Sequence, residues 1–165
     1  MIINPARIVL KIKSFLQQPL FIKIWLLPTW FLLGVCKALI LTIPFKRLAP
    51  ILGVPSGTSA AIPLLTPDQE KLALNIGRAV RLAANYTPWD SNCFPQAVAA
   101  RILLGLYRVP YLLSFGLMRD PETADMKAHA WVAAGRVNVT GGESFHAYSV
   151  VGVFMSPLLI NDQVC

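Results

Sequence analysis

One cysteine near the middle of the chain lies where a helix is expected to begin. Ser91 and Asn92, just before Cys93, are good helix caps, and Pro95 follows at a position where a helix tolerates proline only in its first turn. Apolar residues then recur at helical spacing up to Gly105. The unpaired N–H groups and the positive dipole end of a helix start stabilise a thiolate. The sequence therefore predicts a nucleophilic Cys93, with an inert buried cysteine as the alternative.

The N-terminal part of the chain carries all of the excess charge. Residues 1–67 contain seven basic residues and no acid, whereas the remainder balances eight bases against eight acids, which gives a net charge of +7. The chain is 55% hydrophobic and 14% charged, so part of its surface is expected to meet something apolar. A basic, apolar region suits an anionic membrane surface or an acidic protein partner. The basic residues form no run with interleaved aromatics, which argues against a nucleic-acid partner.

Residues 1–47 are expected to form a hydrophobic, basic helical region. The longest uncharged run, from Ile24 to Cys36, has 13 residues, whereas a spanning helix needs about 20. Extending the run would bury Lys37. We therefore expect two or three helices that pack on the rest of the chain or lie in a membrane interface, rather than a transmembrane segment. The N-terminus also lacks the clean apolar core and cleavage site of a signal peptide.

The rest of the chain divides into a linker, a domain and a tail. Residues 48–66 hold three prolines and two glycines and are predicted to form a linker. Thr66 and Gln69 form a capping-box pattern, with proline between them at the first helical position, so a helix should begin at residue 67. We expect one domain over residues 67–156 and a short tail over residues 157–165.

The second half of this domain has the pattern of consecutive strands. Strands are expected over residues 109–117, 128–133, 136–140 and 145–154, with a tight turn at Ala134-Gly135. Helices followed by strands indicate an α+β domain with a meandering antiparallel sheet.

His129 and Trp131 lie two residues apart on the second predicted strand and so share one of its faces. If that face packs on the helix of Cys93, the imidazole would lie near the thiol. It would then hold the thiolate as an ion pair and return a proton to a leaving amine. A structural role for His129 is the alternative.

Three segments of the chain carry a family resemblance. They are residues 88–97, with Cys93-Phe94-Pro95-Gln96-Ala97, residues 106–117, and residues 128–137, with Ala128-His129-Ala130-Trp131-Val132. In order and spacing they resemble the stand-alone leader peptidases of lasso-peptide biosynthesis, which belong to the transglutaminase-like, papain-related cysteine hydrolase superfamily. The resemblance covers about residues 66 to 154.

This resemblance implies a fold and an activity. The fold would be a transglutaminase-like core with the catalytic helix packed on an antiparallel sheet. The activity would be removal of the leader from a ribosomally made precursor peptide, before a separate ATP-dependent lasso cyclase closes the ring. The family's catalytic pair falls on Cys93 and His129.

The third catalytic residue of the family has no clear counterpart. Family members often have an aspartate on the strand after the histidine, but this chain has none between Asp125 and Asp162. With a turn at Ala134-Gly135, Thr140 would lie opposite His129 and Asn138 would share its face. Either could orient the imidazole; Glu143 is a more distant candidate.

Several alternatives remain open from the sequence. The same cysteine and histidine could transfer the acyl group to an amine instead of water, or the domain could be a catalytically weak or inactive scaffold in a membrane-associated complex. Residues 1–65 show no strand pattern for pairing with a leader, so a separate leader-recognition protein is expected. The three cysteines form no metal-ligand cluster, so we expect no metal, no cofactor and a reducing, cytoplasmic location.

Overall fold

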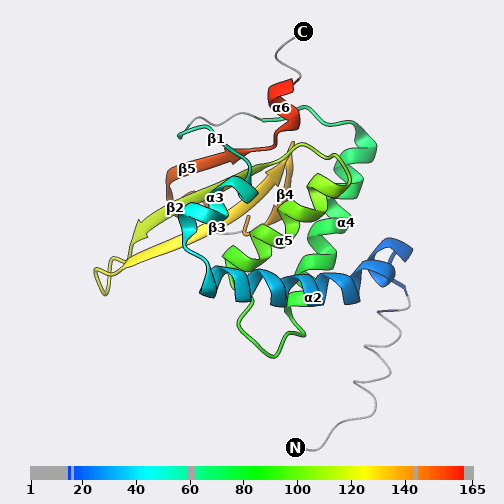
Figure 1. The fold of residues 1–165 in the computed structure, drawn as a ribbon, viewed down its shortest axis with the longest axis horizontal. Coiled ribbons are helices and arrows are strands. Elements are labelled where there is room, and N and C mark those ends of the chain that lie inside the picture. Colours follow the sequence, from blue (N-terminus) through cyan, green and yellow to red (C-terminus); the bar gives the residue numbers. More distant parts are fainter. Residues whose placement is uncertain (1–14, 16, 59–61, 143–144, 162–165) are drawn as a thin grey trace, which may run out of the picture.

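The structure is a computed structural model that describes residue 15 and residues 17–58, 62–142 and 145–161. It is an α+β arrangement, as predicted. Figure 1 shows three helices packed together beside one antiparallel sheet: α2 (Leu20–Thr42), α4 (Pro67–Ala84) and α5 (Cys93–Leu106). Helix α2 crosses α4 and α5 at the end of the molecule away from α6 (Leu158–Asn161), which lies in the predicted tail.

The N-terminal region forms α2 (Leu20–Thr42) and α3 (Phe45–Leu52). One face of α2 is buried against the rest of the chain through Ile22, Leu33 and Cys36. Two tryptophans also fasten it: Trp25 Nε1 donates to Tyr107 Oη at 2.7 Å, and Trp30 Nε1 donates to the carbonyl of residue 86 at 3.0 Å. By length and composition alone, α2 is long and apolar enough to cross a membrane, and it is the helix of the described residues that meets these two criteria.

Part of the segment predicted to be a linker, residues 48–66, forms regular secondary structure. These residues include the second half of α3 and the two-residue strand β1 (Val54–Pro55), which pairs with β5 (Ser149–Met155). The expectation that residues 1–65 contain no β element is therefore wrong. Two residues are too few to show any periodicity, so this strand could not be predicted from the sequence.

Helices α4 (Pro67–Ala84) and α5 (Cys93–Leu106) begin where the sequence predicted. The Gln69 backbone N–H donates to Thr66 Oγ1 at 3.3 Å, and the Thr66 N–H donates to Gln69 Oε1 at 3.0 Å. This reciprocal pair satisfies two amides that the helix itself leaves unpaired.

The sheet has five strands in the order β1-β5-β2-β3-β4, including β2 (Leu112–Arg119), β3 (Met126–Ala134) and β4 (Val137–Thr140). The predicted meander holds from β2 to β4 and is wrong for β5, which pairs with β2 instead of β4. The connection over residues 141–148, which contains the 3₁₀ turn η1 (Phe145–Ala147), is too long for a tight hairpin. It lets the chain cross the sheet, so that β5 pairs with the edge of β2 opposite to β3.

Tyr111 fixes α5 to the segment before β1. Its side chain is 1% exposed, and its hydroxyl accepts from Arg101 Nε at 2.7 Å and donates to the Leu52 carbonyl at 3.0 Å. Burial raises the pKa of Tyr111, and Arg101 lowers it in part, so the hydroxyl keeps the proton that it donates.

We predict that Tyr111→Phe lowers the free energy of unfolding by about 1–3 kcal/mol, because it leaves a buried carbonyl and a guanidinium N–H without their partner. Tyr107→Phe is the control. It removes a similar hydroxyl, but one on a side chain that is 37% exposed, where water can replace it. Urea unfolding measures both, and equal losses would contradict the role given to Tyr111.

Candidate functional site

Cys93 is the first residue of α5, as the sequence predicted. The preceding residue, Asn92, has an extended backbone and makes no side-chain cap, and Pro95 lies in the first turn. The Cys93 side chain is partly buried against the hydrophobic core. The N–H groups in the first turn of a helix have no partner within the helix, so they can donate to an oxyanion that forms beside this thiol.

The loop before Cys93 is held by its own hydrogen bonds. Thr87 Oγ1 lies 2.9 Å from Ser91 Oγ and also 2.9 Å from the carbonyl of Trp89. Gln96 Nε2, one turn into α5, donates to the Ser91 carbonyl at 2.7 Å. These bonds fix the direction from which the chain enters the helix, and hence the position of the thiol.

Trp89 in the same loop packs on α2, a contact that the sequence analysis missed. Its ring centroid lies 5.0 Å from that of Trp30. A Cβ added at Gly34 of α2 would come within 2.9 Å of the Trp89 ring, so only glycine allows this approach. The pairing of a tryptophan with a glycine 55 residues earlier leaves no local trace in the sequence. Through this contact, α2 supports the loop that carries the candidate nucleophile.

His129 lies on β3, opposite Gly116 of β2. Its Nε2 lies 2.8 Å from the carbonyl oxygen of Gly141. A carbonyl only accepts, so Nε2 carries a proton in this arrangement. The imidazole also packs on two aromatic rings, with centroid distances of 4.9 Å to Tyr148 and 5.9 Å to Trp131.

The structure does not join Cys93 and His129 by a hydrogen bond within the part of the chain that it describes. Ala130 and Val132 of β3 belong to the core cluster that contains the buried face of α5. Side chains alternate along a strand, so His129 and Trp131 lie on the other face. The pair expected from the sequence is therefore separated by the sheet in this arrangement.

The turn of the β3–β4 hairpin lies one residue later than predicted, so the predicted register is wrong. The turn residues are Gly135 and Arg136, so Ala134 pairs with Val137. Gly135 has a φ of +57°, which suits glycine at the first position of a two-residue hairpin turn. An irregularity between Val132 and Ala133 then shifts the register again.

This register moves both candidates for the orienting residue. Thr140 pairs with Val132 rather than lying opposite His129, and Asn138 pairs with Ala133. Neither makes a hydrogen bond to the imidazole in the described residues, where the Gly141 carbonyl takes that place. Thr140 is 1% exposed and its hydroxyl has no partner there. Glu143 lies outside the described residues.

The other described cysteine has no features of a reactive thiol. Cys36 on α2 is 1% exposed, and burial raises its pKa to about 11, so it stays protonated near neutral pH. The described residues contain no group of three or more histidine, cysteine or acidic side chains that could hold a metal ion. Of the two described cysteines, Cys93 is therefore the one suited to act as a nucleophile.

A helix that starts with a cysteine and packs on an antiparallel sheet is the core architecture of papain-related cysteine hydrolases. A comparison with family models agrees, because the model for the transglutaminase-like superfamily matches residues 38–153. The chain belongs to this superfamily. The match begins inside α2, so the family region includes part of the helix that supports the loop before Cys93. No curated protein and no solved structure matches the chain.

We predict that Thr140→Val changes the free energy of unfolding by less than about 1 kcal/mol, because the buried hydroxyl that it removes has no partner. Thr66→Val is the control, since the Thr66 hydroxyl caps α4 and its loss should cost about 1 kcal/mol or more. Thermal unfolding of both variants is the measurement. A larger loss for Thr140→Val than for Thr66→Val would mean that the Thr140 hydroxyl is bonded in solution.

Proposed function

We propose that this protein is a cysteine peptidase that removes the leader peptide from a ribosomally made lasso-peptide precursor. The observation that carries the proposal is the place of Cys93, the first residue of α5 in a transglutaminase-like domain. The segments around Cys93 and His129 support it further, since they resemble the lasso leader peptidases.

In the proposed reaction, the Cys93 thiolate attacks the carbonyl carbon of the scissile peptide bond. The oxyanion that forms is stabilised by backbone N–H groups at the start of α5. The C–N bond then breaks, the amine of the core peptide leaves with a proton from His129, and the leader remains as a thioester on Cys93. Water, deprotonated by His129, hydrolyses the thioester and restores the thiol.

This reaction requires a change in the position of His129. The imidazole has to break its hydrogen bond to the Gly141 carbonyl, which costs about 0.5–1.5 kcal/mol of free energy. It also has to pass around the edge of β3 to the side of α5, and in the described residues the pairing of β3 with β4 extends only to Val132. The proposal therefore includes rearrangement of this part of β3 when the precursor or a partner binds. Thr140 or Asn138 would orient the imidazole in that state.

The proposal places the protein in a cytoplasmic pathway with two other proteins. A separate leader-recognition protein would hold the leader and raise its effective concentration at Cys93. An ATP-dependent lasso cyclase would then use the amine that cleavage releases. The family resemblance supports both partners, and the reducing cytoplasm would keep the Cys93 thiol free.

The second candidate is a catalytically weak or inactive scaffold. The bond between His129 and Gly141 favours it, because that bond keeps the imidazole from the thiol. The lack of an aspartate on the strand after His129 also favours it. The domain would then act by binding other proteins of a biosynthetic complex rather than by catalysing cleavage.

We predict that Cys93→Ala abolishes precursor cleavage and leaves the fold intact, because it removes the nucleophile with a small change in volume. His129→Ala should also remove most of the activity, whereas Thr140→Ala and Asn138→Ala should cost less. Mass spectrometry of the precursor after incubation measures cleavage. Full cleavage by Cys93→Ala would refute the peptidase proposal, and unchanged kinetics in both of the last two variants would refute their orienting role.

The rate of thiol alkylation separates the peptidase from the scaffold. The test uses Cys165→Ser with the leader-recognition protein present and no precursor, so that no substrate covers the thiol. The other cysteine, Cys36, is buried. An activated Cys93 should react with iodoacetamide at pH 7 much faster than a free thiol, and His129→Ala should abolish the difference. Slow alkylation that does not depend on His129 would favour the scaffold.

We also predict that this chain cleaves a full-length precursor slowly unless the leader-recognition protein is present. The one strand of residues 1–65 in the described ranges, β1, is already paired with β5 and has only two residues. It offers little edge for binding a leader by strand addition. Cleavage rates with and without the recognition protein measure the effect, and equal rates would contradict it.

A further inference from the structure

The face of α2 that points away from the rest of the protein is a continuous apolar stripe. It consists of Leu20, Ile24, Leu27, Phe31 and Val35, whose side chains are 55–71% exposed. Their spacing of three or four residues places them in one row along the helix. The opposite face of α2 is the one buried against the protein. A helix that is apolar on both faces normally has both covered, so something else should cover this stripe.

Two lysines lie beside the stripe on one side of α2. Lys23, Trp30 and Lys37 follow each other at intervals of seven residues, so they share one side of the helix, and all three are partly exposed. Lysine stems can lie along an apolar surface while the ammonium groups reach the anionic headgroups, and tryptophan is typical of the same depth in a bilayer. Residues 1–67 contain no acidic side chain that would repel such a surface.

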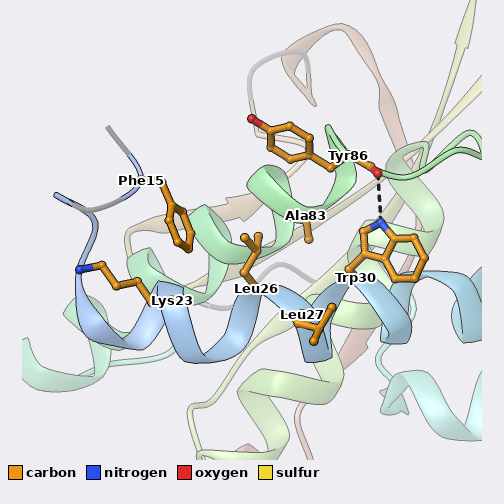
Figure 2. A pocket seen from close by; sticks show the side chains of 7 residues that line it. All are labelled: Phe15, Lys23, Leu26, Leu27, Trp30, Ala83 and Tyr86. Atoms are coloured by element: carbon orange, nitrogen blue, oxygen red, sulfur yellow. Dashed lines mark hydrogen bonds between the residues drawn. The ribbon is translucent and has the colours of Figure 1, made fainter. Parts of the chain in front are cut away.

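A hollow adjoins the stripe on the side of α4. It has a volume of about 370 Å³ and is lined by Phe15, Lys23, Leu26, Leu27, Trp30, Ala83 and Tyr86. Figure 2 shows Leu26, Leu27 and Lys23 projecting from α2 along it, with the hydrogen bond from Trp30 to residue 86 at its end. Leu27 belongs to both the stripe and the hollow, so the apolar surface continues from one into the other. A hollow of this kind suits an acyl chain.

We propose that the protein binds the surface of an anionic membrane through this stripe, with α2 lying in the plane of the interface. A spanning orientation would require α2 to leave α4 and α5. It would expose Ile22 and Leu33 and break the hydrogen bonds of Trp25 and Trp30 to residues outside the helix. Binding in the plane keeps all of these contacts and buries only the stripe, and the flanking lysines add attraction to anionic lipid.

A protein partner fits the stripe less well. A protein partner would need an apolar surface with an acidic rim to match the stripe and the acid-free charge of residues 1–67, whereas an anionic bilayer supplies both along its whole surface. The inference does not depend on peptidase activity, since it concerns only α2 and its surroundings.

The test is flotation of the full chain with vesicles of phosphatidylcholine alone or mixed with phosphatidylglycerol. The wild type should bind the mixed vesicles more strongly. Ile24→Gln with Phe31→Gln should lower the partition constant on both kinds of vesicle by about tenfold. Lys23→Gln with Lys37→Gln should lower it by about tenfold on the mixed vesicles and little on phosphatidylcholine.

The control is Ile62→Gln with Leu64→Gln. These side chains are 74% and 95% exposed. They belong to the segment that leads into the start of α4, and this start lies at the end of the molecule away from α2 (Figure 1). The control should bind as the wild type does, and circular dichroism should show that all variants are folded.

Four outcomes would overturn the proposal. The first is failure of the wild type to bind either kind of vesicle, and the second is an equal loss of binding in the control and in the stripe variant. The third is resistance of the bound protein to a carbonate wash, which would mean that α2 spans the membrane. The fourth is a wild-type dimer that the stripe variant disrupts while no protein binds vesicles.

Discussion

Close packing between small side chains of α5 and β3 is the constraint on which the rest of this structure depends. Ala97 and Ala100 of α5 and Ala130 and Ala134 of β3 are at most 1% exposed and belong to one core cluster. Alanines on both sides allow the helix to lie close to the sheet, where larger side chains would hold it away. The direction of α5, and therefore the position of Cys93 at its start, follows from this contact.

The same packing determines which face of β3 is open to chemistry. Since Ala130 and Val132 face α5, alternation sends His129 and Trp131 to the other face, where Tyr148 packs on the imidazole. A Cβ at Gly116 would come within 2.7 Å of the Cβ of Tyr148, so the glycine makes room for this cluster. A productive meeting of His129 with Cys93 therefore requires a change in β3 rather than a rotation of one side chain, and this requirement links the proposed activity to binding of a precursor or partner.

The parts of the fold that the sequence predicted are those encoded within a few residues. The capping box at Thr66 and Gln69 and the helix start at Cys93 are local patterns, and both are confirmed. The errors arose where distant segments decide the outcome. Pairing of β5 with β2 has no local pattern, and neither has the contact of Trp89 with Gly34. At the hairpin, a turn displaced by one residue shifts every pair after it by two positions, and the irregularity between Val132 and Ala133 adds one more. Thr140 therefore pairs with Val132 instead of His129.

In the proposed reaction, Cys93 forms a covalent bond with the leader during cleavage. The most direct measurement is acid quenching of the protein with precursor and recognition protein on the time scale of one turnover, followed by mass spectrometry of the intact chain. We expect a population whose mass has increased by that of the leader acyl group, with the adduct on the peptide that contains Cys93. Cleavage of the precursor with no adduct on that peptide, or with an adduct at another residue, would contradict it.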